Sequence, residues 1–235
     1  MVRLKNNLKI NQQILSKSPS KRPGGNHTKT SITIHSTANE QSTAKNERNW
    51  LTNPNNNRSA SWHYCVDEND IIQAIPDNET AYHCGNSYGN TFSLSIEICE
   101  SGNRLKALEN AVELTAQKMI ELNLTLNDIK THFDWTGKNC PRILIDRHYI
   151  KDNLNWDWFI RAVKQRVGEL TAMNNEEFKA LAKDCLEERA KLPVSEWAEE
   201  EWQRATKLGI TDGSKPQSYA TREQVIAMIM RALEV

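Results

Sequence analysis

His35, His132 and Cys140 are the three side chains whose types and spacing point most directly to chemistry. Neutral imidazole and thiolate are ligands that zinc prefers, and three protein ligands leave the fourth tetrahedral position to water, as in catalytic zinc sites. Without a metal, the same residues would be a strand-end histidine and a buried free thiol. Cys140 and His132 could also serve as nucleophile and base of a cysteine peptidase. Pro141 directly after the cysteine and the third candidate ligand His35 favour the metal.

Glu97 and Lys138 are the candidate catalytic residues beside this set. Glu97 can take a proton from an attacking water and pass it to a leaving amine. Lys138 precedes Cys140 by two residues, so it can place a cation near a developing oxyanion. The alternative for each is an ordinary solvated surface charge.

The strands that must carry these residues are predicted from alternation of apolar and polar side chains. In residues 31–35 the isoleucines alternate with Thr33 and His35, and in residues 93–99 Glu97 falls on the polar face. Residues 62–67 and 71–75 are shorter β-prone runs that predict a hairpin.

Helical patterns lie between and after these strands. Apolar spacing predicts helices over residues 44–51, 104–123 and 156–167, and a polar linker helix over 173–191. Residues 17–30 are rich in Pro and Gly, so we expect a loop there and a core that begins after it. The predicted fold is therefore an α/β domain with a central mixed β-sheet flanked by helices, plus a small helical C-terminal module.

Composition limits the class of protein. Hydrophobic residues make up 38% and charged residues 26%, and 30 Lys and Arg balance 30 Asp and Glu, so a soluble globular domain is expected and nucleic acid is not. No apolar run reaches the roughly 18 residues of a membrane span, so no membrane partner is expected. Because the start of the chain lacks the apolar stretch of a secretory signal, we expect a cytoplasmic protein that meets its substrate after release. Five cysteines without a CxxC pair argue against a disulfide scaffold.

Five ordered segments of the chain belong together: residues 32–38, 61–64, 81–85 and 95–98 and the pattern His132-x7-Cys140-Pro141. They resemble the zinc amidase family that includes phage lysozyme-type amidases and the peptidoglycan recognition proteins. In chain order, they are similar to the family's first strand with its ligand histidine, its second strand, its substrate-side turn, its strand with the catalytic carboxylate, and its second and third ligands.

The resemblance implies a peptidoglycan hydrolase that cleaves the amide between the lactyl group of N-acetylmuramic acid and L-Ala of the stem peptide. It implies one zinc ion per chain at His35, His132 and Cys140, with Glu97 and Lys138 as catalytic residues. Substrate contacts are expected from His83, Trp62 and His63, although His63 could equally be a packed strand residue. Family members often carry Tyr at the position of Trp62, so Glu97 must do more of the acid and base work here. A phage or prophage endolysin is the expected type of protein, and a non-catalytic peptidoglycan-binding module is the main alternative, although such binders commonly lack the cysteine ligand.

The C-terminal part resembles a single S-layer-homology repeat, a module that associates with cell-wall polymers. About forty residues with Trp197 and Trp202 cannot easily bury an apolar face alone, so we expect contact with wall polymer or with a second copy of the chain. A helical hairpin that packs on the catalytic domain is the alternative. The expected organisation is a catalytic domain over residues 1–167, a helical linker over 168–192 and the small module over 193–235.

Overall fold

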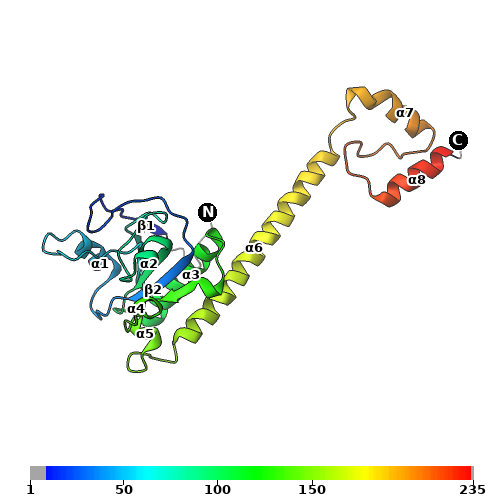
Figure 1. The fold of residues 1–235 in the computed structure, drawn as a ribbon. Coiled ribbons are helices and arrows are strands. Elements are labelled where there is room, and N and C mark those ends of the chain that lie inside the picture. Colours follow the sequence, from blue (N-terminus) through cyan, green and yellow to red (C-terminus); the bar gives the residue numbers. More distant parts are fainter. Residues whose placement is uncertain (1–8, 234–235) are drawn as a thin grey trace. The chain divides into compact units, whose positions relative to one another are not determined.

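The computed structural model describes residues 9–233, apart from the side chains of residues 173 and 174 (Figure 1). The chain divides into two compact units, Met1–Leu170 and Thr171–Val235. The division falls close to the predicted end of the catalytic domain at residue 167. The expected ranges also include residues 1–8 and 234–235, which lie outside the described residues, and a separate linker over 168–192 stays a prediction.

One six-stranded mixed sheet forms the centre of the first unit, in the order β1-β4-β3-β5-β2-β6. Strands β3 and β4 are antiparallel and the other neighbouring strands are parallel. The strands are β1 (Ile10–Gln12), β2 (Ser31–Ser36), β3 (Tyr64–Val66), β4 (Ile71–Gln73), β5 (Ser93–Ile98) and β6 (Ile129–Thr131). The predicted fold class is confirmed.

Helices flank this sheet, and a further pair belongs to the second unit (Figure 1). In the first unit they are α1 (Ala44–Leu51), α2 (Ser87–Phe92), α3 (Arg104–Glu121), α4 (His132–Thr136), α5 (Arg142–Ile145) and the start of α6 (Trp156–Ala190). The second unit contains the rest of α6, α7 (Glu199–Lys207) and α8 (Arg222–Leu233). No helix among the described residues is long and apolar enough to cross a membrane.

Both faces of the sheet are buried, as the burial of nearly every residue of β2 and β5 shows. One face packs its isoleucines and leucines against α3 and against Phe159 and Val163 of α6. The opposite face packs Cys65 and Ile72 against residues of α1, such as Leu51. Parallel strands covered on both faces are typical of α/β domains, so the faces that the sequence marks as polar are interior surfaces as well.

Three expectations about the elements are wrong in detail. The core does not begin after residue 30, because β1 pairs with β4 and Leu15 is buried. The two helices predicted over 156–167 and 173–191 are one helix, α6, since Gly168 is tolerated within it and no proline interrupts it. Strand β6 and the helices α2, α4 and α5 are three to six residues long and lie outside the longer apolar patterns that predict β3 and β4, so the sequence does not predict them.

Candidate metal centre and active site

The candidate site forms where parallel strands end. In the pairing of β2 with β5, His35 lies opposite Glu97, and in the pairing of β2 with β6, Ile34 lies opposite Thr131. His132 follows Thr131 and begins α4, where the Thr131 hydroxyl accepts a hydrogen bond from the Asp134 amide at 3.1 Å. Adjacent parallel strands therefore bring residues 35, 97 and 132 together at the carboxyl ends of the strands. This is the usual location of ligand sites in open α/β sheets.

A pocket of about 160 Å³ lies at this edge and collects most of the predicted site residues. The predicted residues among its lining are His35, Trp62, His83, Glu97, His132, Lys138 and Cys140. His63 does not line it. The lining also includes Glu47 of α1 and Asn139, which sequence reasoning missed. Asn139 is next to Cys140 and could have been considered on that ground, whereas nothing in the sequence links Glu47 to the site.

Three side chains converge in this pocket as metal ligands do. One ligand atom from each of His35, His132 and Cys140 lies within 4.8 Å of the other two. The Nδ1 atoms of the two histidines are 3.1 Å apart, and the Cys140 Sγ is 3.7 Å from Nδ1 of His35. Two imidazoles and one thiol in a compact buried set are a donor combination that suits zinc.

His83 controls which nitrogen of His35 can bind a metal. The Nε2 of His83 lies 3.2 Å from the Gly89 carbonyl oxygen, which can only accept, so this nitrogen carries the ring proton. The Nδ1 of His83 must then accept a hydrogen bond from Nε2 of His35, at 3.0 Å. His35 is left with an unprotonated Nδ1 that faces His132 and Cys140. Outer partners of this kind orient metal-ligating histidines.

The electrostatics of the pocket fit a cation. Burial is the main cause that lowers the pKa of both histidines, to about 4 for His132 and well below the usual value for His35. Both rings are therefore neutral, which is the form that binds metal. Burial also raises the pKa of the Cys140 thiol to about 12. A bound dication would reverse that last effect, because it stabilises the thiolate directly.

Glu97 is held in the pocket without a hydrogen-bond partner. Its Oε2 atom is buried and unpaired within the described part of the chain. Burial, followed by repulsion from Glu47, raises its pKa to about 8, although the charge of Lys138 opposes the shift. A buried, unpaired carboxylate oxygen in a pocket is typical of a group that receives a proton or ligand from outside the protein.

Lys138 and Trp62 frame the pocket, and their roles stay predictions. Lys138 is exposed in the turn after Gly137, and its carbonyl accepts a hydrogen bond from the Cys140 amide at 2.7 Å. Trp62 is buried and lines the same pocket. Lys138 is thus connected through the backbone to the candidate ligand Cys140, and Trp62 supplies an apolar wall.

His63 is a packed interior residue that directly precedes β3. It is fully buried, its Nδ1 accepts a hydrogen bond from the Ser95 amide at 3.0 Å, and its Nε2 donates to the Glu79 carbonyl at 2.9 Å. Both nitrogens of His83 are likewise engaged, with His35 and Gly89. Neither ring therefore offers a free nitrogen to a substrate in this arrangement, and contact through the ring edge of His83 stays a prediction.

A buried ion pair joins the three segments that carry the site. The side chain of Glu100, three residues after Glu97, is 0% exposed and forms three contacts of 2.6–3.0 Å with the Arg142 guanidinium. Arg142 lies two residues after Cys140. Glu100 also accepts a hydrogen bond from the Ala38 amide at 3.0 Å. Ala38 lies three residues after His35 and lines the pocket. Ala38 has a φ of 54°, which is unfavourable for a residue with a Cβ and has to be held by its surroundings.

Comparison with known proteins places the site within one family. Residues 25–143 match the family described as N-acetylmuramoyl-L-alanine amidase, a range that contains every predicted site residue and ends before the second unit. The amidase CwlH of Bacillus subtilis (strain 168) is 37% identical over 161 residues, which are 66% of this chain and 60% of the relative. The amidase XlyA of the same organism is 38% identical over 156 residues, 64% of this chain and 49% of the relative. The chain thus spans about half to three-fifths of the length of these relatives.

This chain is also similar to solved structures of amidase and endolysin domains. The catalytic domain of XlyA superimposes with a TM-score of 0.59 at 36% identity, over 66% of this chain and 99% of that domain. A mutant endolysin from Bacillus subtilis gives a TM-score of 0.60 at 35% identity, over 66% and 99%. The catalytic domain of PlyG, solved in solution, gives 0.58 at 33% identity, over 68% and 96%.

We expect His83→Leu to weaken Zn²⁺ binding by about 10–100-fold, because partners that orient a metal-ligating histidine typically contribute that much. Competition with a chelator of known affinity measures the change. His83→Gln is the matched control, since its carboxamide oxygen can still accept the His35 proton, and it should lose less. Equal Zn²⁺ affinities of parent and His83→Leu would show that His83 does not orient His35.

We expect Arg142→Met to lower the free energy of unfolding by about 3–5 kcal/mol, because it leaves the buried Glu100 carboxylate without its partner. Denaturant titration measures this value. In the double variant Glu100→Gln/Arg142→Met the unpaired charge is gone, so part of the loss should return. If the double variant were no more stable than the single one, the buried charge would not be the cause.

Proposed function

Because the chain belongs to the N-acetylmuramoyl-L-alanine amidase family, we propose that it is a peptidoglycan hydrolase. The bond it cleaves is the amide between the lactyl group of N-acetylmuramic acid and L-Ala of the stem peptide, and bacterial peptidoglycan is its substrate. The convergence of His35, His132, Cys140 and Glu97 in one pocket carries this proposal. The names of the relatives support the same reaction.

One zinc ion per chain is the proposed cofactor, held by His35, His132 and Cys140. The neutral state of both histidines and the orientation of His35 by His83 support this ligand set. When bound, zinc supplies electrophilic activation of the scissile carbonyl and of the attacking water.

Glu97 is the proposed general base and acid. Its unpaired Oε2 atom accepts the proton that the attacking water loses, and the same carboxyl then delivers it to the nitrogen of L-Ala as the C–N bond breaks. The water oxygen ends on the lactyl carboxylate, and the stem peptide leaves with a free amine. Burial raises the pKa of the Glu97 carboxyl, which makes its ionised form a stronger proton acceptor than an exposed carboxylate, and a cation in the same pocket would favour that ionised form.

Lys138 is proposed to stabilise negative charge on the carbonyl oxygen as water adds. Its ammonium lines the pocket from the loop that carries Cys140, so it needs no rearrangement of the sheet to reach the reacting group. Trp62 is proposed to bound the substrate on an apolar side and to exclude water. It has no hydroxyl with which to share the proton transfer.

The alternatives are less well supported. A cysteine peptidase needs a thiolate next to a basic histidine, but Cys140 is 5% exposed and burial raises its pKa. Its sulfur faces the Ser36 amide at 3.4 Å and His35, rather than the intended base His132. A binding module without activity would not require an unpaired carboxylate beside the ligand set.

We infer that the protein acts as an endolysin of a phage or prophage, which reaches the cell wall after release from the cytoplasm of the producing cell. The similarity to endolysin catalytic domains supports this type of protein. The first unit is the part of the chain that the matching domains resemble.

The second unit is proposed to attach the enzyme to wall polymer or to a second copy of the chain. None of its described hydrophobic residues is buried, which is unusual for a compact unit of this size. Helix α8 exposes an apolar stripe of Val225, Ile226, Ile229, Met230 and Leu233. The aliphatic stripe fits another helix, whereas Trp197, 86% exposed, fits stacking on a sugar ring.

Digestion of purified peptidoglycan tests the proposed reaction. We expect new lactyl carboxylates and N-terminal L-Ala in equal amounts, and we expect Glu97→Gln to lower turnover by about 10²–10⁴-fold, the usual contribution of a positioned general base. Mass spectrometry identifies the ends. Zinc content and thermal stability of the variant serve as controls and should stay unchanged. New ends elsewhere in the stem peptide, or none at all, would contradict the amidase assignment.

Light scattering and wall pull-down test the second unit. If a second copy covers α8, light scattering should give the full chain a mass above that of a monomer. The double variant Ile226→Glu/Ile229→Glu should be monomeric, because dimerisation would bury its two new carboxylates. Gln203→Glu, at an exposed position of α7, is the control. If wall polymer is the partner, the parent should be monomeric and sediment with walls. A monomer that does not bind walls would contradict both forms of the proposal.

A further inference from the structure

Glu47 lies on the inward face of helix α1. Ala44 precedes it by three residues and Leu51 follows it by four, so the three side chains share one side of the helix. Ala44 and Leu51 are buried in the core beneath α1. Glu47 is half-buried between them and lines the metal pocket. The helix therefore directs a carboxylate toward the pocket.

The Glu47 carboxylate has no protein partner that explains this position. Within the described part of the chain it takes part in no hydrogen bond or ion pair, and it is not one of the converging ligands His35, His132 and Cys140. Its charge repels that of Glu97, and after burial this repulsion is the largest cause that raises the pKa of Glu97. A half-buried acid beside a like charge costs stability unless another group pairs with it. The pairing group therefore has to enter the pocket from outside the chain.

Charges of opposite sign enter the pocket from opposite directions along the sheet. Glu47 belongs to α1, which packs on β3 and β4, whereas Lys138 belongs to the turn that follows β6 and α4. Strands β5 and β2, which carry Glu97 and His35, lie between β3 and β6. The pocket thus has a negative side and a positive side, and the proposed base belongs to a strand between them.

An amide that undergoes hydrolysis develops the same polarity. Its carbonyl oxygen gains negative charge as water adds. When the Glu97 carboxyl transfers its proton to the amide nitrogen, this nitrogen is positively charged until the C–N bond breaks and the bonding electron pair stays on nitrogen. The released amine then takes a further proton from the new carboxylic acid or from solvent and becomes an ammonium group. The nitrogen is thus a hydrogen-bond donor throughout the reaction and a cation in part of it.

We propose that Glu47 is a further catalytic residue, which accepts a hydrogen bond from the nitrogen of the scissile amide and stabilises the positive charge that this nitrogen gains when Glu97 protonates it. The inference rests on the proposed amidase function. A carboxylate already directed at the place where charge develops needs no reorganisation during the reaction. An acid in the first turn also stabilises its own helix, but a side chain on the outward face of α1 would fulfil that role equally well.

The test compares two synthetic stem peptides that are identical except at the first residue. One begins with L-Ala and its free amine, and the other begins with a propanoyl group, in which hydrogen replaces that amine. Calorimetry measures their binding to the zinc-loaded full chain at pH about 6.5, below the usual amine pKa of about 7.7–8.0, so that the amine is an ammonium ion. We expect Glu47→Gln to weaken binding of the amine peptide by about 10-fold, as expected for loss of a charged hydrogen bond, and to leave the propanoyl peptide within about twofold.

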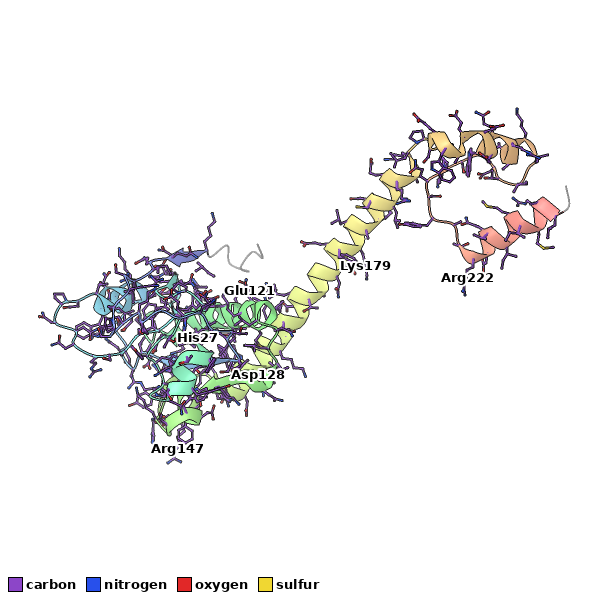
Figure 2. All side chains as sticks on the ribbon, turned by 45° about the horizontal axis from the view of Figure 1, so that its top comes forward. His27, Glu121, Asp128, Arg147, Lys179 and Arg222 are labelled. Carbon is purple, nitrogen blue, oxygen red and sulfur yellow. The ribbon has the colours of Figure 1, made fainter. Side chains whose placement is uncertain are left out.

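Two further variants separate this effect from a structural one. Glu121→Gln removes the same charge at the exposed end of α3, where Figure 2 labels the residue, and should change neither affinity because Glu121 does not line the pocket. Glu47→Asp keeps the charge at a shorter reach and should lie between the parent and Glu47→Gln, which keeps the test valid if the latter is unstable. An equal loss of affinity for both peptides would show that Glu47 only supports the shape of the pocket.

Hydrolysis of soluble muropeptides separates this inference from the proposed function. Glu47→Gln should lower kcat by about 10-fold, the rate equivalent of the same lost interaction, with zinc content unchanged. If the parent cleaves muropeptides and Glu47→Gln matches it in rate and in binding of both peptides, Glu47 is not catalytic although the protein is an amidase. If the parent cleaves none yet prefers the amine peptide in a Glu47-dependent way, the amidase function is wrong and the amine site stands. A parent that does not distinguish the two peptides would contradict the inference in either case.

Discussion

The register of β2 between β5 and β6 is the constraint on which the site depends. Each of these strands has one apolar face, and a shift of one residue would turn that face away from α3 and α6. The same register places His35 opposite Glu97 and brings His132 directly after the end of β6. Burial of isoleucines and leucines on one side therefore fixes the positions of the candidate ligand His35 and the proposed base Glu97 at the ends of the same strands.

Behind the site, the second face of these strands is polar but closed to water, and its groups bind one another. The Thr33 and Ser93 hydroxyls are 2.6 Å apart, and the Trp135 indole donates to Thr33 at 2.9 Å. The buried Lys29 ammonium donates to the carbonyls of Glu79 and Thr91, each at 2.7 Å. These bonds hold the segment between β4 and β5, which includes His83. A buried polar layer that is nearly fully satisfied is rigid, and rigidity lets a site hold unpaired ligand atoms and an unpaired carboxylate.

The two units differ in how far their hydrophobic side chains are buried. The first has apolar cores on both sides of its sheet and closes the metal pocket with short elements at the strand ends. The second keeps its larger hydrophobic side chains at the surface, among them Phe178, Trp197 and Tyr219. If the second unit attaches to wall polymer as proposed, it would raise the local concentration of substrate around the first unit. Within the second unit, the Cζ atom of Arg189 lies 4.8 Å from the centroid of the Tyr219 ring, which is a local cation–π contact.

The sequence by itself determined the central strands and the candidate residues that they carry. Alternation in residues 31–35 and 93–99 identified two central strands and put His35 and Glu97 on their non-apolar faces, because a period of two is a local property of the chain. The residue types of His132 and Cys140, together with the family resemblance of the pattern around them, predicted the remaining candidate ligands. Only the tertiary structure decided which distant residues join them. Glu47 enters the pocket from α1, His83 engages His35, and Glu100 meets Arg142 across 42 positions. No local pattern encodes such pairings, because they arise when strands and loops far apart in sequence are packed at one edge of a sheet.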